Sequence, residues 1–128
     1  MGDQFVVQIQ NRPGELAHLV RALAERGVNL IHCAGGGAGA LGYAVIDTED
    51  DTVAREVLRS IGASFVEGAP VTIELEDQPG ALAAVTDRLA GAGVDIQGLL
   101  TVGRCDGRVL VALTVDDPET ARRVLDVT

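Results

Sequence analysis

The sequence predicts an α+β protein made of two tandem copies of one unit, in the order strand, helix, strand, strand, helix, strand. The stretch NRPGELAHLVRALAERGVNL (11–30) has a near copy in DQPGALAAVTDRLAGAGVDI (77–96), at a spacing of 77 − 11 = 66 residues. Within each copy the apolar residues alternate in one segment and recur at helical spacing in the next. We therefore predict two ferredoxin-like βαββαβ domains, 1–68 and 69–128.

The repeat extends beyond the first helix. The identical pairs include Pro13 and Pro79, Gly14 and Gly80, Leu16 and Leu82, Leu23 and Leu89, Gly27 and Gly93, and Val28 and Val94. After a shift of one residue, 41–58 also matches 108–125. A unit of this length buries only roughly 60% of its unfolded surface. We therefore expect the two copies to pack on each other about a pseudo-two-fold axis.

Each copy opens with a strand and a helix. Apolar side chains alternate with polar ones over 5–10 and 71–76, as in strands with one buried face. The apolar stripe of each first helix is predicted from residues at helical spacing: Leu16, Leu19, Val20 and Leu23 in copy one, and Leu82, Val85 and Leu89 in copy two. Gly27 and Gly93 are placed to end these helices.

A hairpin follows in each copy. Strands are predicted over 28–34 and 41–47 around a flexible glycine turn, 35–39, and over 94–102 and 109–115 around 103–107. A phosphate-binding role for the glycine run is disfavoured because it leads into a strand and no Gly-Lys-Ser/Thr follows.

Second helices are predicted from Asp50–Asp51 and from Asp116–Pro118, because acidic residues favour a first helical turn. Residues 64–67 then supply the last strand of copy one. Copy two ends at 126–128, where its second helix should end, so we predict that the second unit lacks its last strand. An open sheet edge invites a partner chain, and we expect a homodimer.

The composition excludes several classes of partner. The net charge of −9 disfavours nucleic acid and anionic membrane surfaces. No apolar run approaches roughly 18 residues, and the first residues do not resemble a signal peptide. Cys33 and Cys105 form neither a disulfide framework nor a metal motif. We expect a cytoplasmic protein without cofactor or metal.

The polar turn between first strand and first helix is the predicted site. Pro13 and Pro79 suit the first helical position, which would make the poor capping residues Arg12 and Gln78 the N-caps. The N–H groups of the first turn would then be free to bind an anion such as a carboxylate.

Four polar residues complete the predicted site. Asn11 and Asp77 stand in the turns, and Asn29 and Asp95 begin the second strands. Each can accept a hydrogen bond from an ammonium group, so the set is suited to an α-amino acid. The alternative is that these side chains fold back onto their own turns and loops.

These motifs resemble those of the ACT domain, a ferredoxin-like regulatory module that most often binds amino acids. The matching residues are N-R-P-G-x-L with G-V-N-L, and D-Q-P-G-x-L with G-V-D-I. The resemblance covers the whole chain apart from the missing strand. It implies effectors at the domain interface, with Asn11 facing Asp95 and Asp77 facing Asn29. Ile9 stands where a serine-binding relative carries a histidine, which disfavours serine.

The resemblance and the residues together give one predicted site. The predicted ligand-binding residues are Asn11, Pro13, Gly14, Glu15, Leu16, Asn29, Leu30, Ile31, Asp77, Pro79, Gly80, Ala81, Leu82, Asp95, Ile96 and Gln97. Their aliphatic surroundings, with Ile9, Ile31, Leu99 and Leu100, favour a small or branched apolar side chain.

The sequence shows no nucleophile beside a base and no paired carboxylates of a catalytic kind. His18 is expected in solvent, and His32 is expected to be structural or near a ligand. We predict a non-catalytic sensor of a small amino acid that regulates a separate enzyme or its own assembly. The alternative is a ligand-free ACT module for protein–protein interaction. A small enzyme on the same scaffold is the third and least favoured reading.

Overall fold

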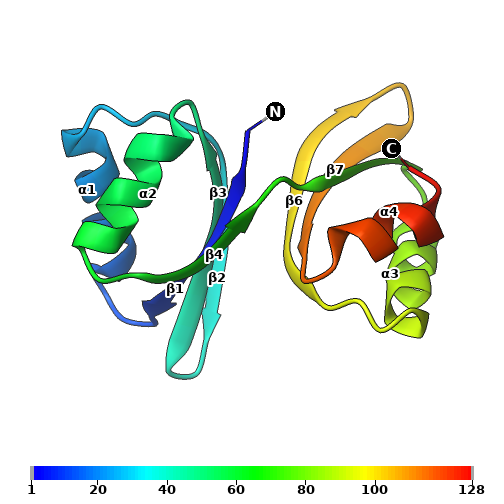
Figure 1. Cartoon of the computed structure of the whole chain (residues 1–128), viewed down its shortest axis with the longest axis horizontal. Coiled ribbons are helices and arrows are strands. Elements are labelled where there is room, and N and C mark those ends of the chain that lie inside the picture. Colours follow the sequence, from blue (N-terminus) through cyan, green and yellow to red (C-terminus); the bar gives the residue numbers. More distant parts are fainter. Residues whose placement is uncertain (1, 128) are drawn as a thin grey trace. The chain divides into compact units, whose positions relative to one another are not determined.

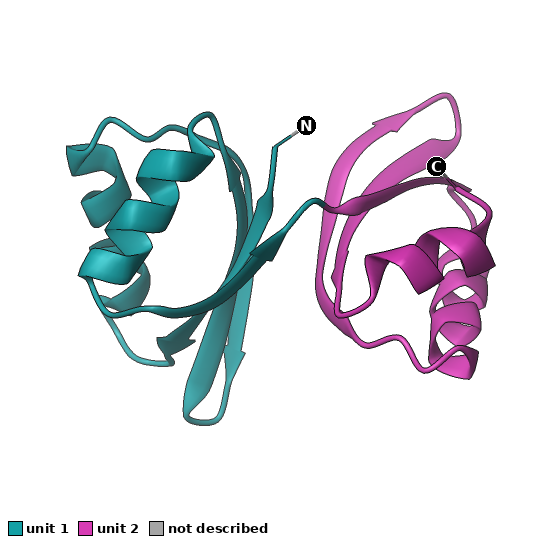
Figure 2. Cartoon of the chain, in the orientation of Figure 1, with its two compact units in different colours: residues 1–69 teal, residues 70–128 magenta. Residues whose placement is uncertain are grey.

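The computed structural model describes residues 2–127. The chain divides into two compact units, Met1–Ala69 and Pro70–Thr128 (Figure 2). The predicted domain limits at residues 1 and 128 lie outside the described residues. The expected helices and strands occur in the predicted order in both units.

Unit 1 is a complete βαββαβ unit. Its elements are β1 (Gln4–Gln10), α1 (Glu15–Glu25), β2 (Leu30–Ala38), β3 (Leu41–Thr48), α2 (Asp51–Ser60) and β4 (Ser64–Gly68). The strands form an antiparallel sheet in the order β2-β3-β1-β4. Both helices cover the same face of this sheet (Figure 1).

The core of unit 1 lies between that face and the helices. Phe5 is paired with Ile46, and Val7 with Ala44, and all four side chains are buried. Because side chains of a strand alternate between faces, this register places the odd-numbered residues of β1 under the helices. Phe65 of β4 packs its ring 6.1 Å from that of Phe5.

Unit 2 repeats this arrangement without the fourth strand, as predicted. Its elements are β5 (Val71–Glu76), α3 (Ala81–Gly91), β6 (Ile96–Cys105), β7 (Arg108–Val115) and α4 (Pro118–Leu125). The sheet order is β5-β7-β6, so within the described residues β5 pairs with β7 alone. α3 and α4 cover one face of this sheet over a core of Val, Leu and Ile (Figure 1).

The second helix of each unit begins as the acidic residues predict. Asp50 caps α2 by accepting the N–H of Val53 at 3.1 Å. Asp117 caps α4 by accepting the N–H of Thr120 at 3.1 Å, with Pro118 at the first helical position. Such caps satisfy N–H groups that the helix itself leaves unpaired.

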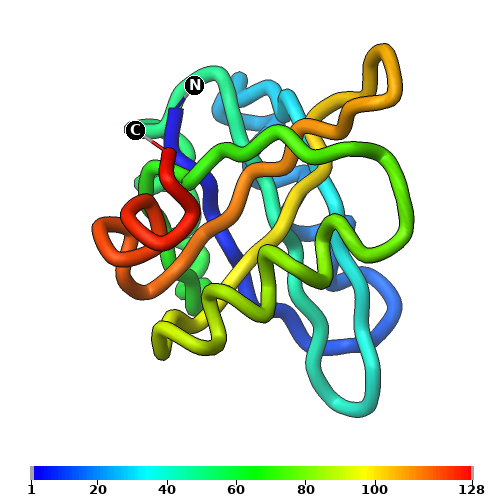
Figure 3. The backbone as a smooth tube through the Cα atoms, turned by 90° about the vertical axis from the view of Figure 1, so that its right-hand side faces the viewer, coloured from blue at the N-terminus to red at the C-terminus, as the bar shows by residue number. Residues whose placement is uncertain are grey.

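The glycine run 35–39 is not the flexible turn that the sequence predicts. β2 continues through it to Ala38, and the turn is only Gly39–Ala40 (Figure 3, cyan to teal). In the second hairpin the turn is Asp106–Gly107, where both residues have positive φ. Close pairing of β2 with β3 requires glycine at position 35, because a Cβ there would lie 2.8 Å from the carbonyl oxygen of Tyr43. Glycine here permits close strand approach, which composition alone does not separate from flexibility.

The buried stripe of each first helix is also smaller than predicted. Leu19 and Leu23 of α1 are buried, as are Val85 and Leu89 of α3. Leu16, Val20 and Leu82 are 48%, 38% and 40% exposed. At 100° per residue Val20 lies beside the stripe, whereas Leu16 and Leu82 lie in line with it but in the first helical turn, where each lines a cavity. Within the described residues no helix has the length and apolarity that crossing a bilayer requires.

Candidate functional site

The two polar turns share one backbone construction. The N–H of Asn11 donates to the carbonyl of Ala40 at 3.0 Å, and the N–H of Asp77 donates to that of Gly107 at 2.8 Å. Each turn is therefore tied to the tip of its unit's hairpin. One residue later, the N–H of Arg12 and that of Gln78 close tight turns onto the carbonyls of Gln10 and Glu76.

The helix caps differ from the prediction. The N-caps are Gly14 and Gly80, with φ of 90° and 91°, rather than Arg12 and Gln78. The two prolines consequently precede the caps. The left-handed conformation costs a residue with a Cβ about 1–2 kcal/mol, which explains glycine at both positions.

Both helix starts lack a side-chain cap. In α1 the N–H of His18 donates to the carbonyl of Gly14 at 2.9 Å, which begins the helical hydrogen bonding. The N–H groups of Leu16 and Ala17 precede it, and no side chain of the described residues caps them. Unpaired N–H groups at a helix start attract anions.

A cavity of about 270 Å³ lies beside the first turn, and we call it the Asn11 cavity. It is lined by Ile9, Gln10, Asn11, Arg12, Leu16, Gly35, Gly36, Gly42 and Tyr43. The Asn11 side chain donates from Nδ2 to the carbonyl of Gly39 at 3.0 Å. Its Oδ1 remains an acceptor, which an ammonium group can use.

A smaller cavity of about 120 Å³, the Asp77 cavity, lies at the corresponding place in unit 2. It is lined by Leu75, Glu76, Asp77, Gln78, Ala81, Leu82, Leu99, Thr101, Arg104, Val109 and Val111. Asp77 is not an unpaired buried carboxylate, because its Oδ2 accepts from Nε of Arg104 at 3.2 Å and its side chain is 45% exposed.

The second-strand residues lie at the other end of each sheet. Nδ2 of Asn29 donates to Glu49 at 3.2 Å, and the N–H of Asp95 donates to Oδ1 of Asp116 at 2.8 Å. Asn11, by contrast, is bound at the hairpin tip. Within one unit the structure therefore does not bring Asn11 to Asn29, or Asp77 to Asp95.

The remaining predicted residues divide between turn, core and surface. Glu15 forms an ion pair with Arg12 at 2.6 Å. Leu30 and Ile96 are half-buried against the cores of their units, whereas Ile31 and Gln97 are exposed. Leu16 lines the Asn11 cavity, and Ala81 and Leu82 line the Asp77 cavity.

Two cavity residues were missed from the sequence. Arg104 was assigned to a flexible turn, although it pairs with Val109 in the β6–β7 ladder and reaches Asp77. Tyr43 of β3 is 48% exposed and lines the Asn11 cavity. Extending the alternation of β6 back from the Asp-Gly turn would have assigned Arg104 to a strand. Across residues 2–127, no group of three or more His, Cys, Asp or Glu is arranged to hold a metal.

Comparison with known proteins gives the family. The model of the ACT domain pair matches residues 1–127. No curated protein matches the chain.

Three solved structures show the same fold. A Bacteroides thetaiotaomicron protein is 22% identical with a TM-score of 0.70, covering 98% of this chain and 86% of its own. The regulatory subunits of aspartate kinase from Thermus thermophilus and Thermus flavus are 21% and 20% identical, with TM-scores of 0.59 and 0.61. Each alignment covers 97% of this chain and 90% of the subunit. The sequence repeat of this chain, the βαββα order that both of its units share, and the family match together show that the chain belongs to the ACT domain pair family.

Proposed function

We propose that this chain is a non-catalytic regulatory protein that binds a small amino acid beside its two polar turns. The observation that carries the proposal is the recurrence of one arrangement in both units. Each has an uncapped helix start, a polar acceptor in the turn and a cavity next to both.

The carboxylate of the ligand would accept from the free N–H groups that follow Gly14 or Gly80. Its ammonium group would donate to Oδ1 of Asn11 or to the carboxylate of Asp77. Charge-assisted bonds of this kind are shorter and stronger than neutral ones. Ile9 and Leu16 beside the first turn, and Leu75 and Leu99 beside the second, favour a short aliphatic side chain.

The two cavities should differ in affinity. The Asn11 cavity is the larger, and within residues 2–127 no cationic side chain is bonded to Oδ1 of Asn11. In the Asp77 cavity an ammonium group would compete with Arg104 for the same carboxylate. We therefore assign the tighter site to unit 1.

The partner of such a sensor would be a separate cytoplasmic enzyme or a second copy of the chain. The similarity in fold to the two Thermus aspartate kinase regulatory subunits supports a regulatory role rather than a catalytic one.

The test is a thermal-shift screen of the full chain against the common amino acids, with Asn11→Ala and Asp77→Ala in parallel. Ligand at about 100 times its Kd stabilises a fold by roughly 2.7 kcal/mol, a shift of several degrees. Each variant is compared with its own ligand-free melting temperature, since Asn11→Ala also removes the bond to Gly39. Asp87→Ala is the matched control, because Asp87 is an exposed acid of α3 outside both cavities.

A rise that Asn11→Ala abolishes and Asp87→Ala leaves intact would support the sensor and identify its ligand class. If no amino acid shifts a cooperative transition, the sensor is wrong and the interaction module takes its place. Size-exclusion chromatography with light scattering would then measure its assembly directly.

A further inference from the structure

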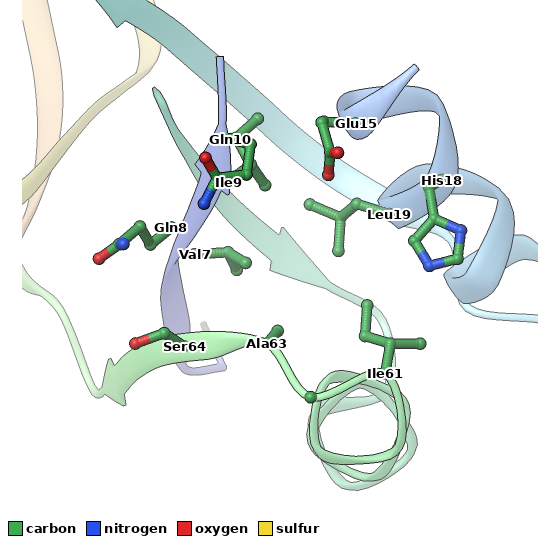
Figure 4. Close-up of a pocket in the computed structure, with 11 residues that line it drawn as sticks. Val7, Gln8, Ile9, Gln10, Glu15, His18, Leu19, Ile61, Ala63 and Ser64 are labelled. Atoms are coloured by element: carbon green, nitrogen blue, oxygen red, sulfur yellow. The ribbon is translucent and has the colours of Figure 1, made fainter. Parts of the chain in front are cut away.

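Unit 1 contains another cavity, on the β4 side of β1, which we call the His18 cavity. Its volume is about 240 Å³. Val7, Ile9, Leu19, Ile61 and Ala63 supply its apolar side chains, and Glu15 and His18 of α1 stand at its mouth (Figure 4).

The cavity exists because β1 is longer than the strand beside it. The last pair of the β1–β4 ladder is Gln8 with Ser64, and β1 continues to Gln10 without a partner on that side. Gly62, with φ of 71°, turns the chain between α2 and β4 and leaves Ile61 and Ala63 facing α1 (Figure 4). The gap is thus bounded by helix, sheet and turn.

Among the polar side chains that line this cavity, Glu15 carries a negative charge. Glu15 offers a carboxylate whose Oε1 accepts a hydrogen bond from Arg12, and within the described residues Oε2 has no such partner. His18 lies three residues later, so both side chains rise from the same face of α1. The lining contains no Lys or Arg, and the chain carries a net charge of −9. The Glu15 carboxylate at the mouth therefore favours a cationic head group over an anionic one.

The Arg12–Glu15 pair does not block such a ligand. Arg12 is 68% exposed on its side chain, and an exposed pair of this kind contributes little to stability. A ligand cation can share the carboxylate or replace Arg12.

The second unit provides an internal comparison. At the 66-residue spacing, Glu15 corresponds to Ala81 and His18 to Ala84. Unit 2 also lacks the strand equivalent to β4. Both the polar mouth and one wall are thus specific to unit 1, although the polar turns recur in both.

We infer that the His18 cavity binds a short alkylammonium ion, with the hydrocarbon chain on the Leu19–Ile61 floor and the ammonium group between Glu15 and His18. This site lies on the β4 side of β1, whereas the Asn11 cavity of the proposed function lies on the β3 side, although Ile9 and Gln10 line both. Because the Glu15 carboxylate stands at the mouth, a zwitterion should be a poorer ligand than the alkylammonium ion.

The experiment is an NMR titration of the ¹⁵N-labelled full chain with four compounds of one length: n-butylammonium, 1-butanol, butyrate and 2-aminobutyrate. Butylammonium should give saturable shifts in amides of 7–10, 15–19 and 61–64. Glu15→Gln should weaken binding about tenfold, the loss expected for one hydrogen bond to a charged group. Glu25→Gln removes the same charge from the other end of α1 and should leave binding unchanged.

A second variant separates the site from general charge effects. Ala63→Met fills the cavity without changing charge and should abolish the shifts, while the spectrum of unit 2 stays that of the wild type. The inference is overturned if butanol or butyrate binds as tightly as butylammonium, or if Glu25→Gln weakens binding as much as Glu15→Gln does. Butylammonium shifts that centre on 11–14 or 77–80 would also overturn it. These outcomes are independent of whether any amino acid binds the polar turns.

Discussion

At Gly35 the side chain that would replace hydrogen meets backbone rather than another side chain. An added Cβ would lie 2.8 Å from the carbonyl oxygen of Tyr43, whereas nothing lies within 4 Å of one at Gly36. We expect Gly35→Ala to destabilise the fold by about 1–3 kcal/mol, because the strands must separate. Gly36→Ala should change stability by less than about 0.5 kcal/mol. Urea unfolding measures both, and equal effects would contradict this steric account.

Glu67 carries the clearest pH dependence of the surface pairs. Arg55 donates two hydrogen bonds to it, and chiefly through these the pKa of Glu67 is lowered from its ordinary value of 4.5. A carboxyl with a lowered folded-state pKa contributes stability above its unfolded pKa and loses it as the pH falls through the folded value. The stabilising contribution of Glu67 should thus be lost below about pH 4.5.

The measurement is the free energy of unfolding of the wild type and Glu67→Gln from pH 7 to pH 3. The difference in the free energy of unfolding between the two proteins should be largest near neutral pH and should disappear as Glu67 is protonated. Asp3 acts in the opposite sense, because burial raises its pKa above 3.8, and Asp3→Asn removes that contribution. Glu56→Gln disturbs only an exposed pair with Arg26 and should change the free energy of unfolding at neutral pH by less than Glu67→Gln does. A constant difference for Glu67→Gln would contradict the assignment.

Among the elements, α1 and α3 depend on glycine where α2 and α4 depend on aspartate. Gly14→Ala and Gly80→Ala should each cost about 1–2 kcal/mol, because the added Cβ is strained at φ near 90°. Gly91, at the end of α3, is the opposite case, since its φ is not positive and nothing lies within 4 Å of an added Cβ. Gly91→Ala should therefore stabilise by up to roughly 0.5–1 kcal/mol. Thermal unfolding distinguishes the two signs.

The order of elements could be predicted from the sequence because it rests on periodicity, and each unit repeats the evidence of the other. The hairpins were predicted too, but not the length of β2, since Gly35–Gly37 carry no periodicity and glycine occurs both in loops and in closely paired strands. The buried stripe of α1 is shorter than predicted, because Leu16, in the first helical turn, is exposed at the mouth of a cavity.

Part of the candidate site could also be predicted from the sequence. The uncapped helix starts and the place of Asn11 and Asp77 followed from local sequence. The Arg104–Asp77 pair joins residues 27 positions apart, and only the register of β6 brings them together. Whether Asn29 and Asp95 share a ligand with the turns stays a prediction.

For the whole molecule, each unit has its own core, and the cores differ in the number of strands that cover them. Leu23 and Leu89 are equivalent residues, 1% and 0% exposed. We expect Leu23→Ala and Leu89→Ala each to cost about 2–5 kcal/mol. Unit 2 has three strands and should therefore have the lower free energy of unfolding. Leu89→Ala should consequently produce a separate, earlier unfolding transition of unit 2.

Two probes can resolve that transition. The only tyrosine, Tyr43, lies in unit 1, so its fluorescence follows that unit while far-ultraviolet circular dichroism follows both. In Leu89→Ala the dichroism should fall before the fluorescence changes. Coincident curves in both variants would show that the two units unfold as one.

The sheet of unit 2 stops at β5, in the position where unit 1 continues with β4 beside β1. In unit 1, β4 shows which sequence can pair with the edge that corresponds to β5. A copy of Ser64–Gly68 joined behind α4 through a turn like Ile61–Ala63 would have a ladder waiting for it. We expect the β5 edge of unit 2 to pair with such a strand, whether it is joined to the chain or supplied as a peptide.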